Sequence, residues 1–174
     1  MFTTQKEPSN EYVPSMLGHT RVVTEQQQGC KNTTLNKQNA RASIKCINCS
    51  KPRVIYCEKK LNDREKRQLR RLLTDVGNIY ECGCVLVPED SYFDKSDTKL
   101  FTRLQMHCGS SVEVPYYTSK YINQSKDVCY YCGQNGVPIE EEVRGQYTTP
   151  MPRCNECKTA GKPPPHTGRK RQAR

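Results

Sequence analysis

Three Cys-x-x-Cys pairs constrain the fold of this chain more than any other feature of its sequence. Each pair places two thiols on one tight turn, where both can bind the same tetrahedral ion. The chain holds eleven cysteines, an odd number, and no apolar leader segment is visible near residue 1. Both features favour metal binding in a reducing compartment over a disulfide framework, so we expect an intracellular protein. The three pairs are Cys46 with Cys49, Cys129 with Cys132, and Cys154 with Cys157.

The composition explains why such a chain needs a metal. Hydrophobic residues make up 34% of its 174 residues and charged residues 26%. Most of the Leu, Ile, Val and Phe residues lie between Ile44 and Val143. A core this small usually needs a disulfide or a metal as an added constraint. We therefore expect a small α+β, zinc-stabilised domain over residues 43–157, with subsites at 43–120 and 126–157, built from zinc-ribbon-like knuckles, short strands and one amphipathic helix.

Both ends of the chain lack the patterns of regular structure. Residues 1–42 are polar and show no sustained period of two or 3.6, which indicates a disordered arm that contains an isolated Cys30. Residues 158–174 are rich in Gly, Pro and basic side chains, and three prolines in a row follow Lys162. This composition predicts an exposed, disordered, basic tail.

The best-defined metal set combines the second and third Cys-x-x-Cys pairs. These pairs are separated by 21 residues, close to the spacing of four-cysteine zinc sites. Disulfides, an iron–sulfur centre and a redox use are the alternatives. A thioredoxin-type redox pair would open a helix in a βαβ unit, whereas these pairs fall in Gly- and Pro-containing loops. We expect one structural zinc bound by Cys129, Cys132, Cys154 and Cys157.

The first pair, Cys46 and Cys49, needs two more ligands. The candidates are Cys82, Cys84, His107 and Cys108. We favour Cys82 and Cys108 because each is followed by a glycine, which suits a turn around a metal. Cys84 would point to the same side of an extended strand as Cys82 and stays an alternative, while His107 fits a surface position better. A second zinc at Cys46, Cys49, Cys82 and Cys108 would bring the total to two ions per chain.

The sequence does not indicate an enzyme. Four thiolates saturate a tetrahedral zinc and leave no open position for water. The chain contains no Gly-rich phosphate loop and no Gly-x-Ser-x-Gly or His-Glu-x-x-His motif. Its three histidines are His19, His107 and His166. They are too few and too scattered to suggest a catalytic metal site.

Few segments show a clear secondary-structure pattern. Residues 61–76 predict a helix, with Asn62 and Glu65 as a capping box and an apolar stripe that includes Leu69 and Val76. Strands are expected at residues 54–56, 79–87 and 112–117, whereas residues 101–106 fit either a strand or a helix. Cys57, at the end of the first strand, is expected to pack as a small hydrophobic residue.

A net charge of +10 favours a polyanionic partner, which could be DNA, RNA or an acidic protein, and we expect nucleic acid. The residues expected to contact it are Arg64, Arg67, Arg70 and Arg71 on the helix and Lys162, Arg169, Lys170 and Arg171 in the tail. The helix arginines could instead form a solvated face. The tail could instead direct nuclear import, and we expect a nuclear rather than a cytoplasmic protein.

The alternative function is a zinc-scaffolded protein interaction module. No segment is long and apolar enough to predict a membrane partner.

Tyrosines near the cysteines fit two roles. They could stack on bases or pack against the metal shell. They are Tyr116, Tyr117, Tyr130 and Tyr131.

The order of these motifs resembles a known pattern. Cys46-Ile-Asn-Cys49-Ser-Lys-Pro-Arg leads to a charged helix and Tyr80-Glu-Cys82-Gly, and Cys108 then precedes Val-Glu-Val-Pro-Tyr-Tyr and Cys129-Tyr-Tyr-Cys132-Gly. Over residues 46–157 this is similar to a family of uncharacterised cysteine-rich, zinc-finger-like proteins of invertebrate genomes, often in mobile-element contexts. The resemblance implies a zinc-binding fold and no particular activity. The pattern has one cysteine at the Cys82 step, so Cys84 departs from it and leaves that ligand open.

Overall fold

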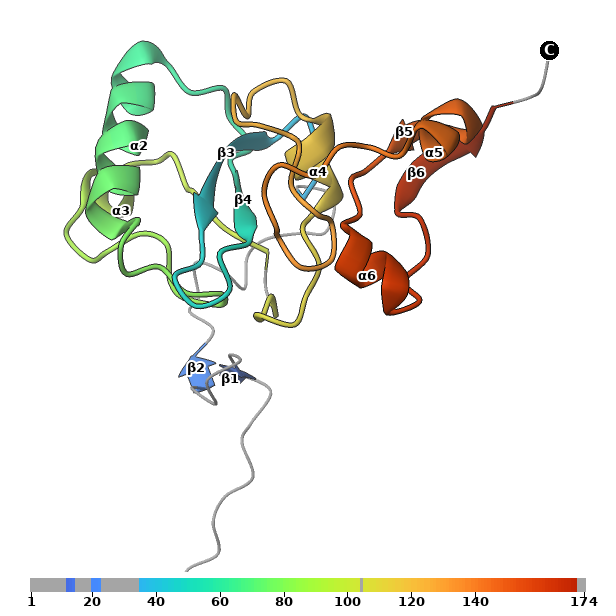
Figure 1. Ribbon diagram of the computed structural model, residues 1–174. Helices are drawn as coiled ribbons and strands as arrows, with labels where there is room; N and C mark the ends of the chain where they lie inside the picture. Colours follow the sequence, from blue (N-terminus) through green and yellow to red (C-terminus); the bar gives the residue numbers. More distant parts are fainter. Residues whose placement is uncertain (1–11, 15–19, 23–34, 104, 172–174) are drawn as a thin grey trace, which may run out of the picture.

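The computed structural model describes residues 12–14, 20–22, 35–103 and 105–171. Figure 1 shows a central β-hairpin of strands β3 and β4, with helices α2 and α3 on one side and α4 close by. Strands β5 and β6 and helices α5 and α6 form a smaller unit at the opposite end from α2. The whole is a mixed α/β arrangement of short sheets and few helices, which agrees with the small α+β fold expected from the sequence.

The central hairpin divides the apolar residues into two clusters. Strands β3 (Ala40–Lys45) and β4 (Pro52–Tyr56) are antiparallel, and all five residues of β4 are buried. Ile55 packs into one cluster, whereas Val54 and Tyr56 pack into the other. This follows from the alternation of side chains along a strand. The hairpin therefore lies between the two apolar clusters and contributes side chains to both.

Helix α2 (Asp63–Val76) covers the first cluster and begins two residues later than predicted, directly after the predicted cap Asn62. Asn62 Oδ1 accepts a hydrogen bond from the Glu65 backbone N–H at 2.9 Å, and Glu65 Oε2 accepts one from the Asn62 N–H at 2.7 Å. Leu69 and Val76 on its apolar face are buried against the hairpin. The helix, its capping box and its apolar stripe are confirmed, as is the packing of Cys57 in the same cluster.

The second cluster contains a helix where a strand was expected. Residues 112–117 do not form a strand, because α4 (Val114–Thr118) occupies most of this stretch. Pro115 stands in the first turn of α4, where the missing N–H of proline costs nothing. The buried Glu113 carboxylate fixes the turn before α4, since it accepts hydrogen bonds from the Val54 N–H at 2.8 Å and the Tyr56 hydroxyl at 2.9 Å.

Two other expectations for the middle of the chain are wrong. Residues 79–87 are turns and not a strand, because Gly83 has a φ of 80° and the chain reverses around Cys82. Among the described part of residues 101–106 there is neither strand nor helix, only a bridge from Phe101 to Tyr56. Helix α3 (Tyr92–Lys95) lies between these segments and buries Phe93 in the first cluster.

The ends of the chain are more ordered than the sequence indicates. Helix α5 (Glu141–Gln146) leads into strand β5 (Tyr147–Pro150), and helix α6 (Asn155–Thr159) into strand β6 (His166–Lys170). Strands β5 and β6 are antiparallel, so residues 158–174 are not a disordered tail throughout. The 1–42 range also contains regular structure: β1 (Tyr12–Pro14) pairs with β2 (Thr20–Val22), and β3 starts at Ala40. Cys30 lies outside the described residues.

Candidate metal centres

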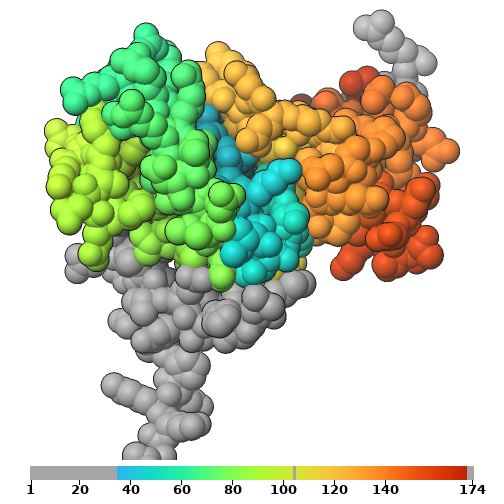
Figure 2. All heavy atoms as spheres, turned by 60° about the vertical axis from the view of Figure 1, so that its left-hand side comes forward, coloured from blue at the N-terminus to red at the C-terminus, as the bar shows by residue number. Residues whose placement is uncertain are grey.

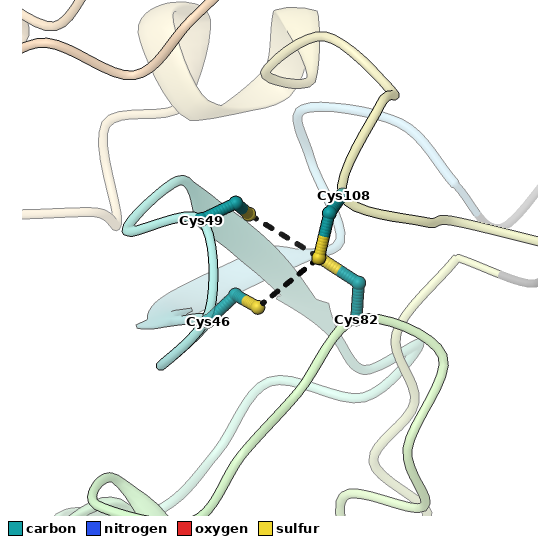
Figure 3. A group of neighbouring side chains, drawn as sticks. All are labelled: Cys46, Cys49, Cys82 and Cys108. Carbon is teal, nitrogen blue, oxygen red and sulfur yellow. Dashed lines mark hydrogen bonds between the residues drawn. The ribbon is translucent and has the colours of Figure 1, made fainter. Parts of the chain in front are cut away.

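The first cysteine cluster consists of Cys46, Cys49, Cys82 and Cys108. Their sulfur atoms all lie within 4.8 Å of one another. Cys46 Sγ is 3.8 Å from Cys108 Sγ, and Cys49 Sγ is 3.7 Å from Cys82 Sγ. Figure 3 shows the four side chains converging from three separate segments of the chain. Cys82 rather than Cys84 joins this cluster, and Cys84 packs against the first apolar cluster instead.

Backbone turns aim these thiols inward. The turn after β3 closes with a hydrogen bond from the Ser50 N–H to the Cys46 carbonyl at 2.8 Å, and Ser50 has a φ of 58°. The Ile47 N–H donates to the Tyr80 carbonyl at 2.9 Å, which holds the segment before Cys82 against the turn. The chain beyond β3 is thus folded back so that distant cysteines meet.

Two buried cations lie beside the first cluster, and neither was predicted from the sequence as a site residue. The Arg53 side chain is fully buried, and its Nε donates to Cys82 Sγ at 3.1 Å. Its other nitrogens donate to the carbonyls of His107, Ser110 and Ser111 at 2.7–3.1 Å. Lys51 Nζ donates to the carbonyls of Cys108 and Ser110 at 2.8 and 2.9 Å. A signal was available, because an arginine inside an otherwise apolar strand requires a buried anionic or polar partner.

Hydrogen bonds and charges around the first cluster shift the pKa values of two of its thiols in opposite directions. The hydrogen bond from Cys82 lowers the pKa of Cys49 to about 4, although burial opposes this shift. The same hydrogen bond raises the pKa of Cys82, which keeps the shared proton. Burial lowers the pKa of Arg53, but its hydrogen bond to Cys82 and its attraction to nearby negative groups together outweigh that effect and raise the pKa overall. A guanidinium therefore stays charged next to the sulfur atoms and offsets part of their negative charge.

The second cysteine cluster consists of Cys129, Cys132, Cys154 and Cys157. Their sulfur atoms also lie within 4.8 Å of one another. Cys129 Sγ is 3.9 Å from Cys157 Sγ, and Cys132 Sγ is 3.5 Å from Cys154 Sγ. The backbone N–H groups of Cys154 and Cys157 each donate to a sulfur atom at 3.4 Å. Burial raises the pKa of Cys129, but backbone N–H groups outweigh it and lower the value to about 7.

One local feature of this cluster differs from the expectation. Cys154 is the N-cap of α6, so the third Cys-x-x-Cys pair opens a helix and does not sit in a loop. The surrounding fold still differs from a redox βαβ unit, because β5 and β6 are antiparallel and do not flank a crossover helix. Both pairs point into one group of four sulfur atoms, as the spacing predicts.

Both clusters fit a tetrahedral ion with four sulfur ligands. Metal–sulfur bonds of about 2.3 Å in a tetrahedron place the sulfur atoms about 3.8 Å apart. Two sulfur–sulfur separations in each cluster lie between 3.5 and 3.9 Å, and all pairs within a cluster lie within 4.8 Å. A disulfide would need sulfur atoms about 2.05 Å apart, and all the described cysteines are free thiols. The geometry is therefore compatible with a structural zinc in each cluster.

The predicted nucleic-acid residues lie in two separate places. Arg64, Arg67, Arg70 and Arg71 are exposed on α2, and Lys162, Arg169, Lys170 and Arg171 are exposed on and around β6. Figure 1 shows that α2 and β6 are at opposite ends of the molecule, so the two sets do not form one surface. The Arg64 guanidinium lies over the Tyr92 ring at 5.5 Å, and Lys162 Nζ lies over the Tyr131 ring at 5.8 Å.

The four tyrosines near the cysteines mainly pack against one another. Tyr116 and Tyr117 meet edge to face, as do Tyr130 and Tyr131. The Tyr116 hydroxyl donates to the Ser125 carbonyl at 2.6 Å, and the Tyr117 hydroxyl donates to the Val128 carbonyl at 2.7 Å. These contacts favour packing over base stacking. His107 is exposed, as expected.

No family model, curated protein or solved structure matches this chain. The resemblance to invertebrate zinc-finger-like proteins therefore stays a prediction that depends on the cysteine pattern. Within the part of the chain that the structure describes, no helix is long and apolar enough to cross a membrane.

Proposed function

We propose that this chain is a structural zinc protein that binds one zinc ion in each cysteine cluster. The proposal is supported by two independent sets of four sulfur atoms, each gathered within 4.8 Å, with separations of 3.5–3.9 Å for two pairs in each set. Four thiolates leave no open coordination position, so each ion would hold the fold together and would not catalyse a reaction. Binding at such a site contributes about 10–16 kcal/mol of apparent free energy, which is coupled to folding.

Two buried cations beside the first cluster would stabilise the negative charge of a zinc ion with four thiolate ligands. Zinc with four thiolates carries a net charge of −2, which is costly to bury without compensation. Arg53 and Lys51 supply two buried positive charges within hydrogen-bond distance of this cluster or its loops. This local neutrality supports metal binding at a buried position.

We further propose that the zinc-stabilised fold binds nucleic acid through its exposed basic residues. The support is the net charge of +10 together with the exposed arginines of α2, of which Arg67 and Arg71 form no ion pair with any described residue. Free guanidinium groups on one helix can contact phosphates, and each contact releases condensed counterions. DNA and RNA share this phosphate chemistry.

A salt titration with charge variants tests this second part. The change is Arg67→Gln with Arg71→Gln, and the control is Lys99→Gln with Arg144→Gln, which removes the same charge from exposed positions outside α2. The α2 variant should bind labelled duplexes more weakly whatever their sequence. The slope of log K against log salt should fall by about 0.9 for each phosphate contact that is lost. Equal effects in the two variants would mean that net charge alone, and no α2 surface, drives binding.

Exposed apolar side chains favour a second candidate function, a protein interaction module. Ile47, Ile79 and Val85 are exposed by 49%, 69% and 42%. The hydrogen bond from the Ile47 N–H to the Tyr80 carbonyl brings the segments of Ile47 and Ile79 together beside the first cysteine cluster. Binding of a protein partner to these apolar side chains should change little with salt, whereas nucleic-acid binding should fall steeply.

A further inference from the structure

A groove with basic walls runs between helix α2, strand β3 and the segment around residue 120. Two adjoining depressions form it, with volumes of about 610 and 530 Å³, and they share Arg41, Lys60, Lys120 and Tyr121. Figure 2 shows β3 recessed between α2 and the segment that follows α4. Lys37 extends the basic lining at one end and Lys66 and Arg70 at the other, and Glu58 is the single acidic residue of the lining. We call this the basic groove.

The floor of the basic groove is apolar. Ala42 of β3 and Leu61, Leu69 and Leu73 at and before α2 line it beneath the charged side chains. A site for phosphate alone would need only cations, whereas a floor of this kind gives space to a planar, weakly polar group. The chemistry of the groove therefore fits a ligand with an anionic backbone and planar rings.

Tyr121 and Arg41 supply a stacking surface inside the groove. Tyr121 is 39% exposed, and the Arg41 guanidinium lies 5.0 Å from the centre of its ring. Lys120 Nζ lies 5.3 Å from the same ring. Bases of single-stranded nucleic acid stack on aromatic rings and on guanidinium planes. This ring therefore differs from Tyr116 and Tyr117, whose hydroxyl groups are committed to backbone carbonyls.

Arg41 is held in place by the fold itself. Its Nη1 donates to the Gln38 carbonyl at 2.7 Å, and its Nε donates to the Lys59 carbonyl at 3.2 Å. Carbonyl groups orient the guanidinium without neutralising its charge, and Arg41 forms no ion pair with any described residue. A fixed cation over an exposed ring loses little side-chain freedom when a ligand binds.

We propose that the basic groove is a binding site for single-stranded nucleic acid, in which Tyr121 and Arg41 stack with a base and Lys120 contacts phosphate. The proposal rests on the nucleic-acid function proposed above and gives it a site and a strand preference. Among the eight basic residues predicted from the sequence, only Arg70 lines this groove. Arg64, Arg67 and Arg71 would then contact the phosphate backbone of the nucleic acid beside the groove.

The test uses the full zinc-loaded chain and fluorescence anisotropy. The nucleic-acid probes are labelled oligothymidylate, oligouridylate and a DNA duplex of the same length, and labelled polyglutamate is the polyanion control. Tyr121→Ala should weaken binding of the single strands by about 5- to 150-fold, the range for loss of one stacked base. Tyr121→Phe should bind like the parent chain, because it keeps the ring. Lys120→Gln should lower the single-strand salt slope by about 0.7. Zinc content measured on each variant shows that the fold is intact.

The outcomes separate the two proposals. Tighter binding of single strands that depends on Tyr121 supports the groove, and the two single-stranded probes show whether it prefers DNA or RNA. Binding that is equal for duplex and single strands and unchanged in Tyr121→Ala overturns the groove and leaves the general nucleic-acid function standing. No binding to any of the three probes overturns both proposals. Tyr121-dependent binding of polyglutamate without binding of nucleic acid would assign the groove to an acidic protein partner and overturn the proposal.

Discussion

Gly133 of the second cysteine cluster lies directly against Lys51, the residue that braces the first cluster. A Cβ atom added to Gly133 would lie 2.6 Å from Lys51 Cγ and 3.2 Å from Lys51 Cα. The Lys51 amino group in turn donates to the Cys108 carbonyl at 2.8 Å. The two candidate metal centres are therefore in contact through Lys51. A change in packing at Gly133 should also disturb the lysine that binds the Cys108 loop.

Replacing Gly133 with Ala should destabilise the protein for two reasons. Its φ of +83° costs a residue with a side chain about 1–2 kcal/mol, and the new methyl group would overlap Lys51. Gly136→Ala is the matched control, because Gly136 has a φ of +71° and open space around its Cβ position. Thermal unfolding of the zinc-loaded variants should show the larger loss in Gly133→Ala. Equal losses would mean that the contact with Lys51 contributes nothing.

Replacing Arg53 with Met should weaken the first metal centre specifically. The change removes the donor to Cys82 Sγ and leaves the carbonyls of His107 and Ser111 without that partner. Removal of one member of a buried charge pair costs about 3–5 kcal/mol, and loss of a hydrogen bond to a metal ligand lowers affinity by about 10- to 100-fold. Chelator competition should release one zinc early while the other stays bound.

Arg103→Gln is the control for the Arg53 variant. Arg103 is also paired with a buried carboxylate, Glu113 at 3.2 Å, but its side chain is 40% exposed and its partner is a carboxylate and not a cysteine. It should leave the chelator titration unchanged. Simultaneous release of both ions in Arg53→Met would show that Arg53 supports the whole fold and has no selective effect on the first cluster.

Cys82→Ser and Cys84→Ser should differ, although the two residues are only two positions apart. Cys82 belongs to the four-sulfur group, whereas Cys84 packs against the first apolar cluster. The first variant should lose one zinc ion per chain and unfold at a lower temperature. The second should keep both ions. Zinc measured by a colorimetric assay on the denatured proteins checks the difference, and loss of one ion in Cys84→Ser would reverse our choice of ligand.

The basic C-terminal residues should be tested by substitution and not by deletion. Strand β6 pairs with β5, the Met151 N–H donates to the Pro165 carbonyl at 2.9 Å, and the Tyr147 and His166 rings stack at 3.6 Å. Truncation before Pro165 should therefore expose β5 to proteases. Arg169→Gln with Lys170→Gln should keep β5 protected and lower only the salt dependence of nucleic-acid binding. A truncated chain with the protease pattern of the parent would show that β6 does not stabilise β5.

The cysteine sets and helix α2 could be predicted because both depend on local spacing. A Cys-x-x-Cys pair carries its geometry within four residues, and the α2 capping box and apolar stripe do the same. Residues 79–87 have the composition of a strand, but the segment must turn at Gly83 to bring Cys82 to the other sulfur atoms. Tertiary constraints at the cluster override strand propensity there.

The pairing of Arg53 with Cys82 and the groove around Tyr121 could not be predicted from local spacing. Arg53 becomes a partner of Cys82 only because β4 is buried on both faces, and the residues that line the groove come from three segments far apart in the sequence. The order of β6 depends on its pairing with β5, which the proline-rich composition of residues 163–165 hides.

Native mass spectrometry of the chain purified under reducing conditions counts the metal ions in each molecule. We expect two zinc ions in the folded protein, and one in each of the Cys46→Ser and Cys129→Ser variants. A chelator that removes both ions should abolish the cooperative unfolding transition, because metal binding supplies most of the stability of a fold with so small a core. A metal-free chain that still unfolds cooperatively would contradict this prediction.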